Sequence, residues 1–393
     1  MPERRGLSQS HKGMKPRFVE PVCVGSKILY TAREFASCFR HSVMRLSCRK
    51  MAQGIKRSNS RDPRLNYGWL EKRPSSGLPI GGEIKLIPLR EKYPEQFDDF
   101  NLIYLVSSAL PAHAEEIVAA AKAKGVRLVW NQNGIAYPGC YGDFYPWFNL
   151  RMATLRSQAD YIVNQSEFSR ISAERYLGHS AAPSGICFNP VDTTHFSPGE
   201  RSLAEEPWRI LAAGTSHAPY RTQSVLDTLR LLLARGRDVH LTIAGEFRWK
   251  GADHEVRQAM AGIEERVTIL PPFRQDEAPD IYRRSHLLLH TKFNDPCPTV
   301  PIEAMSCGLP VVGTCSGGMP ELVPKECGIL VPVPQEWKKD VAGDPADLAD
   351  AVECVMENHS AMSDAAREHA VDTFELRNWL DRHEQIFQQV IES

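Results

Sequence analysis

The sequence lacks the features that mark membrane-spanning and secreted proteins. It contains no run of about 18 apolar residues, and its first residues show no apolar core of a signal peptide. The ten cysteines include no C-x-x-C pair and no regular spacing, which favours reduced, mostly buried thiols over a disulfide framework. We therefore expect a cytoplasmic protein.

The signatures of common nucleotide-cofactor and metal enzymes are missing as well. No G-x-x-x-x-G-K-[ST] loop occurs, and the turn "AAGTSHAP" has one glycine where a dinucleotide fingerprint has three. His286 and His290 are four residues apart but fall in a predicted strand, which favours core or cleft-edge positions over metal ligands. We expect neither an ATPase nor a dehydrogenase, and neither a cofactor nor a metal site.

A net charge of −1 conceals a strongly basic N-terminal segment. Residues 1–75 hold 17 Lys and Arg against 5 Asp and Glu, a surplus of 12. One interpretation is a solvated extension. The other is peripheral contact with an anionic membrane at its inner face, because Phe35, Phe39 and Val43 recur at helical spacing among arginines. Nucleic-acid binding is not expected, since no recognition motif accompanies the charge.

A chain of 393 residues is too long for one ordinary core, so we expect two domains of about 150 to 200 residues each. Residues 1–65 are expected to be irregular, apart from a strand at 27–31, and residues 66–192 to form the first domain. Its strands are predicted at residues 101–107, 126–131, 160–164 and 185–189, with helical segments between them. This β-α-β series predicts a parallel sheet with helices on both faces.

An acidic, proline-rich run at residues 193–207 predicts a linker, and a second series occupies residues 208–375. Its six strands are predicted at residues 209–214, 239–245, 267–270, 286–290, 310–313 and 328–331. The fold class is therefore α/β, with two Rossmann-like doubly wound domains facing a cleft. The terminal helix at 376–393 has one apolar face, for which the first domain is a candidate partner.

The stretch from His290 to Val323, "HTKFNDPCPTVPIEAMSCGLPVVGTCSGGMPELV", contains the candidate site. Asp295 and Glu303 are separated by seven residues, and a helix is predicted to begin near Thr299 between them. Backbone N–H groups at a helix start are free to bind a phosphate. The pair of acids alone favours ordinary solvated or capping carboxylates.

Six segments in order carry a resemblance to a known family. They read "NPVDTTHFSP", "ILAAGTSHAPYR", "LTIAGE", "VTILPPFRQDEAPDIYRRSHLLLH", "DPCPTVPIEAMSCGLPVV" and "SGGMPELV". From about residue 208 to residue 333 the chain resembles the donor-binding domain of retaining glycosyltransferases with the GT-B fold, family 4, glycosyl transferases group 1. The N-terminal domain resembles that family only in outline.

The resemblance implies a role for each matching residue. Glu303 would hold the ribose hydroxyls of a nucleotide, and Asp295 would lie near the donor sugar and the leaving phosphate. Thr299 and Val300 would donate backbone N–H groups to the diphosphate, and Arg221 takes the place of the lysine that neutralises it. Asp295 and Arg221 are therefore the catalytic candidates.

The other donor-binding candidates lie on turns. Gly214 belongs to the first strand-helix turn of the second domain, and Gly81 and Gly82 belong to a glycine-rich loop that lets the backbone approach a ligand. Ser216 stands where the family has a second cation, and Asp295 stands where it has glutamate. The candidates to replace the missing cation are Lys250, Arg248 and Lys85.

The resemblance implies a hexosyl-type glycosyltransferase of polysaccharide biosynthesis, which retains the anomeric configuration and needs no metal. Its donor would be a nucleotide-diphosphate sugar, and its acceptor the hydroxyl of a glycan, a lipid-linked sugar or a small molecule. One alternative is a catalytically impaired nucleotide-sugar-binding protein, motivated by Asp295 and Ser216. Another is a related GT-B epimerase or phosphorylase.

Overall fold

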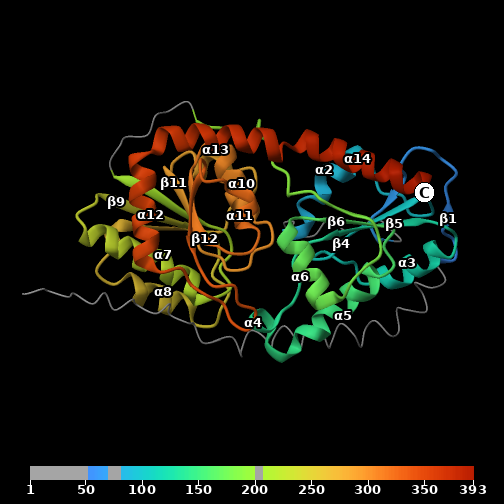
Figure 1. Ribbon diagram of the computed structural model, residues 1–393, viewed down its shortest axis with the longest axis horizontal. Helices are drawn as coiled ribbons and strands as arrows, with labels where there is room; N and C mark the ends of the chain where they lie inside the picture. Colours follow the sequence, from blue (N-terminus) through green and yellow to red (C-terminus); the bar gives the residue numbers. More distant parts are fainter. Residues whose placement is uncertain (1–51, 70–80, 200–206) are drawn as a thin grey trace, which may run out of the picture.

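The computed structural model describes residues 52–69, 81–199 and 207–393. Two domains lie side by side, each built around a parallel sheet (Figure 1). The strand predicted at 27–31 and the basic residues before position 52 lie outside the described residues. No helix of the described part is long and apolar enough to cross a membrane.

The N-terminal domain contains a five-stranded parallel sheet in the order β2-β4-β5-β6-β7. The strands are β2 (Leu65–Asn66), β4 (Leu102–Val106), β5 (Arg127–Gln132), β6 (Tyr161–Asn164) and β7 (Ser184–Ile186). β4 is buried at every position, because helices cover both faces of the sheet, as is usual for parallel sheets. α3 (Ala114–Lys122) and α5 (Tyr145–Arg156) pack on one face, and α2 (Leu86–Lys92) packs on the other.

The expectation of an irregular segment through residue 65 is wrong for its described part. Ala52 and Ile55 are buried in the core of the N-terminal domain. β1 (Lys56–Arg57) pairs in parallel with β3 (Asp99–Phe100). The N-terminal domain therefore begins before the predicted boundary at residue 66.

The C-terminal domain contains a six-stranded parallel sheet in the order β10-β9-β8-β11-β12-β13. Its strands are β8 (Trp208–Ala213), β9 (Val239–Ala244), β10 (Val267–Leu270), β11 (Leu287–His290), β12 (Val311–Cys315) and β13 (Gly328–Pro332). The helices between them are α7 (Pro219–Ala234), α8 (Ala252–Met260), α9 (Ala278–Tyr282), α10 (Thr299–Ser306) and α11 (Met319–Leu322). Each strand predicted in this series overlaps an observed one, so the doubly wound sheet is confirmed.

Two segments connect the domains. The segment after β7 places Val191 and Phe196 in the core of the C-terminal domain, so the described part of the predicted linker is packed rather than free. After α12 (Pro345–Glu357) and α13 (His359–Phe374), the chain returns as α14 (Leu376–Glu392). The two segments meet where the Leu376 N–H donates to the Val191 carbonyl at 3.0 Å.

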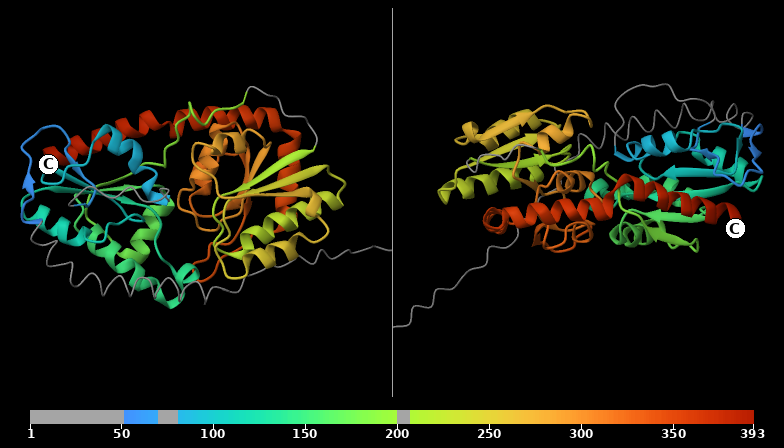
Figure 2. Two further views of the ribbon diagram at one scale, coloured as in Figure 1. Left: turned by 180° about the vertical axis from the view of Figure 1, so that it is seen from behind. Right: turned by 90° about the horizontal axis from the view of Figure 1, so that it is seen from above.

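α14 lies along the N-terminal domain, as the views in Figures 1 and 2 agree. Trp379, Ile386 and Phe387 belong to the same core cluster as Leu65 and Tyr104. His383 is fully buried there, and its Nε2 lies 3.0 Å from the Tyr104 hydroxyl. The last helix of the chain therefore completes the core of the first domain.

Candidate functional site

The strand order of the C-terminal domain defines where a ligand can bind. From β8 the chain proceeds outward through β9 and β10, and then returns to place β11 on the other side of β8. Ligands of such sheets bind beyond the carboxyl ends of the strands at this reversal. A hollow at that point is lined by residues that include Gly214, Ser216, Arg221 and Thr291.

Arg221 lies in the first turn of α7 and is held by the loops around the hollow. Its Nη1 donates to the Thr215 carbonyl at 2.6 Å, and the Thr291 hydroxyl donates to the Arg221 carbonyl at 3.1 Å. Its Nε is buried and has no hydrogen-bond partner among the described residues. Burial lowers the pKa of Arg221, yet a guanidinium remains charged at neutral pH. The site therefore contains a fixed cation with unused donor capacity.

Asp295 lies five residues after β11 and forms an ion pair with Lys292, whose Nζ is 2.6 Å from its Oδ2. Burial favours a raised pKa for Asp295, but the charges of Lys292, His290 and Arg221 outweigh it and hold the pKa below its usual value. The carboxylate is therefore ionised at neutral pH. Asp295 and Arg221 are thus coupled electrostatically.

The glycine turn after β12 fixes the backbone of Asp295. The Gly318 N–H donates to the Asp295 carbonyl at 2.8 Å. Gly317 has a φ of 63°, and a Cβ there would lie 2.3 Å from the same carbonyl oxygen. Only glycine combines a left-handed conformation with such a close approach. The "SGG" turn therefore positions the loop that carries Asp295.

Glu303 lies on α10 and is 7% exposed. Its two carboxylate oxygens accept hydrogen bonds from the Gln275 amide and the Tyr282 hydroxyl, each at 2.7 Å. Burial raises the pKa of Glu303, although both hydrogen bonds oppose that shift. A carboxylate offers about four acceptor positions, so two donors leave it able to accept from further hydroxyl groups.

The start of α10 lies beside the first strand-helix turn of the domain. α10 begins at Thr299 after Pro298, and no side chain caps it. Gly214 has a φ of 93°, and a Cβ at that position would lie 3.4 Å from the Val300 side chain. Gly214, Thr299 and Val300 are therefore brought together, with the N-terminus of a helix open to an anion.

Gly81 and Gly82 lie in the other domain, in a short 3-10 helix at Gly81–Glu83. A Cβ on Gly82 would lie 2.3 Å from the Ser108 hydroxyl and 3.0 Å from the Asn133 amide nitrogen. Gly82 therefore packs on the carboxyl ends of β4 and β5. This close packing within the N-terminal domain explains why position 82 is glycine.

The N-terminal strand ends face the loop of Asp295 directly. The Ser166 hydroxyl donates to the Pro296 carbonyl at 2.5 Å, and a Cβ on Gly134 would lie 3.7 Å from the Pro296 ring. The Asn189 amide donates to the Cys297 carbonyl at 2.7 Å. The strand ends of the N-terminal domain therefore contact the loop that precedes α10.

Sequence reasoning missed two charged or titratable residues near this site, Lys292 and His217, whereas His290 was predicted as a core or cleft-edge residue. Lys292 pairs with Asp295, and His290 is buried at the end of β11. Burial and neighbouring cations lower the pKa of His290 to about 3 and that of His217 to about 4. Neither histidine lies in a predicted catalytic position, and nothing in the local pattern places Lys292 beside the acids.

The structure also locates the three cations considered as replacements at Ser216. Arg248 is exposed and forms an ion pair with Glu246 at 2.7 Å, and Lys250 is exposed. Lys85 is buried in the N-terminal domain, where Nζ donates to the side chains of Asn131 and Asn133, and burial lowers its pKa to about 7. The Arg248 N–H donates to the Ser216 carbonyl at 2.8 Å, so Arg248 adjoins the turn of Ser216 with its side chain paired to Glu246.

The thiols near the site are structural. Cys297 and Cys307 are buried, and burial raises the pKa of each to about 12. These two agree with the expectation of buried thiols, whereas Cys140, Cys315 and Cys354 are exposed. Within the described residues, no group of three or more His, Cys, Asp or Glu is placed to hold a metal ion.

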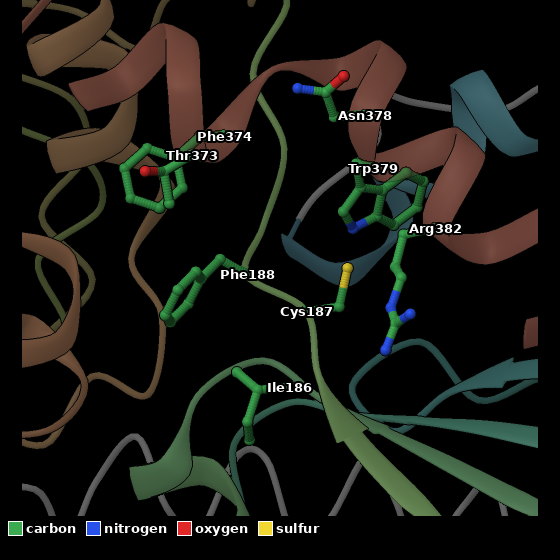
Figure 3. Close-up of a pocket in the computed structure, with 8 residues that line it drawn as sticks. All are labelled: Ile186, Cys187, Phe188, Thr373, Phe374, Asn378, Trp379 and Arg382. Atoms are coloured by element: carbon green, nitrogen blue, oxygen red, sulfur yellow. The ribbon is translucent and has the colours of Figure 1, made fainter. Parts of the chain in front are cut away.

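A second hollow of about 180 Å³ lies at the crossing between the domains. Figure 3 shows Trp379 and Arg382 from α14 on one side of it, with Cys187 and Phe188 from the segment after β7 on the other. No predicted site residue lines this hollow. This hollow is therefore separate from the donor-site candidates described above.

Sequence comparison finds similarity to a known family in the second domain. Residues 208–358 match the family described as glycosyl transferases group 1. A D-inositol 3-phosphate glycosyltransferase of Mycolicibacterium gilvum is 35% identical over 143 residues, which are 34% of this chain and 32% of that protein. The phosphatidylinositol N-acetylglucosaminyltransferase gpi3 subunit of Schizosaccharomyces pombe is 27% identical over 136 residues, which are 35% of this chain and 30% of that protein. These matches span only about a third of each relative.

Structural comparison covers both domains. The structure of Anabaena Alr3699/HepE in complex with UDP and glucose matches with a TM-score of 0.64 and 18% identity, over 84% of this chain and 100% of that one. Sucrose-phosphate synthase of Thermosynechococcus elongatus matches with a TM-score of 0.59 and 16% identity, over 82% of each chain. The fold is therefore GT-B, as the sequence predicted.

Proposed function

Since residues 208–358 form a glycosyl transferases group 1 domain within a GT-B fold, we propose that this chain transfers a sugar from a nucleotide-diphosphate sugar to a hydroxyl acceptor, with retention of the anomeric configuration. One observation carries the proposal. Arg221, the ionised Asp295 and the uncapped start of α10 converge where the strand order of the sheet reverses. That arrangement suits a diphosphate between a cation and a helix N-terminus.

The contacts support a division of roles. Glu303 retains acceptor capacity for the ribose hydroxyls, since among the described residues only Tyr282 and Gln275 donate to it. Thr299 and Val300 offer N–H groups to the diphosphate, and Gly214 lets the phosphates come close to the turn. Arg221 stabilises the charge that develops on the leaving group.

The reaction balances without a protein nucleophile. The bond between the anomeric carbon and a diphosphate oxygen breaks, and a bond forms between that carbon and the acceptor oxygen on the same face. The acceptor proton passes to the leaving phosphate oxygen. In such a reaction, the largest contribution to the rate comes from preorganised hydrogen-bond donors and cations that stabilise the departing diphosphate. Asp295 lies beside the sugar and orients it.

The names of the similar proteins suggest where to look for substrates. HepE is described in complex with UDP and glucose, so UDP-hexoses are the first donors to test. The curated relatives act on inositol-containing molecules by name, which makes small polyols, free or lipid-linked, the first acceptors to test. The peripheral membrane contact remains a prediction about residues outside the described part.

Incubation of the pure protein with radiolabelled UDP- and GDP-sugars and a set of polyol and glycan acceptors tests the proposal. We expect labelled product, or slow release of free sugar when no acceptor is present, and we expect both to continue in EDTA because protein cations neutralise the diphosphate. Retention is read from the anomeric signals of the product by NMR. Saturable donor binding without any turnover would contradict the proposal and indicate a nucleotide-sugar-binding protein.

A further inference from the structure

The candidate donor site contains fewer fixed cations than a diphosphate requires. A nucleoside diphosphate carries more than one negative charge, and Arg221 is the one cationic residue among the described residues that line the hollow. Ser216, on the same turn, is neutral, and its hydroxyl donates to the Ala218 carbonyl at 3.2 Å. A second charged group is therefore expected within reach of the phosphates.

Lys292 is the one further cation that the described residues place beside Asp295. It follows β11 directly after Thr291, which lines the hollow with Arg221. Its ammonium is 2.6 Å from Asp295, yet its side chain is 42% exposed while that of Asp295 is 12% exposed. The Lys292 side chain is therefore partly exposed at the end of β11, with its ammonium group paired to the Asp295 carboxylate.

The charge of Lys292 acts on groups from two loops of the site, the turn after β8 and the loop after β11. Its charge helps to lower the pKa of His217, on the turn after β8, after the larger effect of burial. It also contributes to the lowered pKa values of His290 and Asp295. Arg221 contributes to the pKa shifts of the same three groups, so the charges of Lys292 and Arg221 act on one set of neighbours.

We propose that Lys292 is the second diphosphate-binding cation of the donor site, and that it exchanges Asp295 for the phosphates when the donor binds. This inference rests on the proposed function and specifies which cations bind the diphosphate in the donor site. A lysine is suited to the exchange because its compact ammonium sits on a flexible four-carbon stem. The exchange also releases Asp295, so that its carboxylate faces the donor sugar only when a donor is present.

The competing explanation is that Lys292 serves only to neutralise Asp295. In that case, removing the lysine would weaken donor binding through repulsion between an exposed Asp295 carboxylate and the phosphates. Removing both charges would then restore binding. If Lys292 contacts the phosphates itself, the double variant remains as weak as the single one.

Calorimetric titration with UDP and with uridine distinguishes these cases. We compare the wild type with Lys292→Met, Lys292→Arg, the double variant Lys292→Met/Asp295→Asn and the control Lys325→Met, which removes a lysine that is 92% exposed between α11 and β13. Loss of a charge-assisted contact is expected to weaken UDP binding by about ten- to a hundredfold. Uridine binding should not change, because uridine has no phosphate.

The expected pattern is weak UDP binding by Lys292→Met and by the double variant, near-normal binding by Lys292→Arg, and normal binding by Lys325→Met. Wild-type affinity in Lys292→Met, or restored affinity in the double variant, would overturn the inference while leaving the proposed function intact. If the wild type itself bound neither UDP nor GDP, the proposed function would fail first. If the methionine variants do not fold, Lys292→Gln, alone and combined with Asp295→Asn, replaces them with the same two outcomes.

Discussion

The ring of Trp337 in the C-terminal domain stacks on the ring of Phe168 in the N-terminal domain, with 5.3 Å between centroids and 8° between planes. Tyr137 and Tyr176 contact the same indole, and the Arg175 guanidinium lies 5.5 Å from its centre. The Gly139 N–H donates to the Trp337 carbonyl at 2.7 Å. These contacts fasten the loop after β13 to the N-terminal domain.

A carboxylate strengthens the same domain contact. Both oxygens of Glu321, on α11, accept from the backbone N–H groups of Glu167 and Phe168 at the start of α6 (Glu167–Leu177). The acid thus occupies the positive end of a helix that belongs to the other domain. Together with Trp337, it holds the two halves of the cleft in one orientation.

Trp337→Ala should loosen this arrangement. The change removes the stacking, which is worth about 0.5–1.5 kcal/mol per aromatic pair beyond buried area, and also the cation-π contact. We expect a larger radius of gyration in small-angle X-ray scattering and faster proteolysis between the domains. Trp337→Phe keeps a ring and should lie close to the wild type. An unchanged scattering curve for Trp337→Ala would show that the other contacts suffice.

Glu303→Ala should remove the discrimination between ribose and deoxyribose nucleotides. If Glu303 accepts hydrogen bonds from the ribose, the wild type should bind UDP more tightly than 2′-deoxy-UDP or 3′-deoxy-UDP, by about 1.5–3 kcal/mol for a hydrogen bond to a charged group. In Glu303→Ala the affinities should converge. A preference for UDP that survives in the variant would assign Glu303 to structural support of Tyr282 alone.

The stability of the α14 contact should depend on pH through His383. Burial lowers the pKa of His383 to about 3, whereas an unfolded histidine titrates near 6.5. As the pH falls, the unfolded state therefore binds a proton before the folded state does. The contribution of neutral His383 to folding stability is complete above about pH 6.5. It is lost progressively towards pH 3, at up to about 1.4 kcal/mol per pH unit.

Melting temperatures of the wild type and His383→Gln at pH 7.5 and pH 5 check this dependence. The stability advantage of the wild type over the variant should shrink at pH 5. His254→Gln, which changes an exposed histidine on α8, serves as the control and should show no such pH-dependent difference. An equal difference at both pH values would mean that His383 does not titrate with unfolding.

The order of the elements was predictable because strands such as β4, β6 and β11 are buried on both faces and therefore read as continuous apolar runs. The start of α10 was equally clear, since Pro301 fits the first turn of a helix and Asp295 precedes it in the loop. β2 was missed because Leu65–Asn66 is too short to show periodicity. α2 was missed because Pro88 stands within it, directly after a glycine-rich loop.

The remaining features depend on contacts between distant parts of the chain. Trp337 lies in a proline-rich loop, and only the folded structure shows that Phe168 and Tyr176 surround it. Lys292 is three residues from Asp295, but its ion pair requires the backbone path between them, in which Asn294 has a φ of 52°. Such relationships cannot be read from residue types and spacing.

The thermal stability of the wild type in the presence of nucleoside diphosphates tests the central claim most directly. A ligand at a hundred times its dissociation constant stabilises the folded state by about 2.7 kcal/mol, so UDP or GDP should raise the melting temperature by several degrees, and Arg221→Met should lose that shift. The account is contradicted if neither nucleotide raises the melting temperature of the wild type, or if Arg221→Met responds as the wild type does.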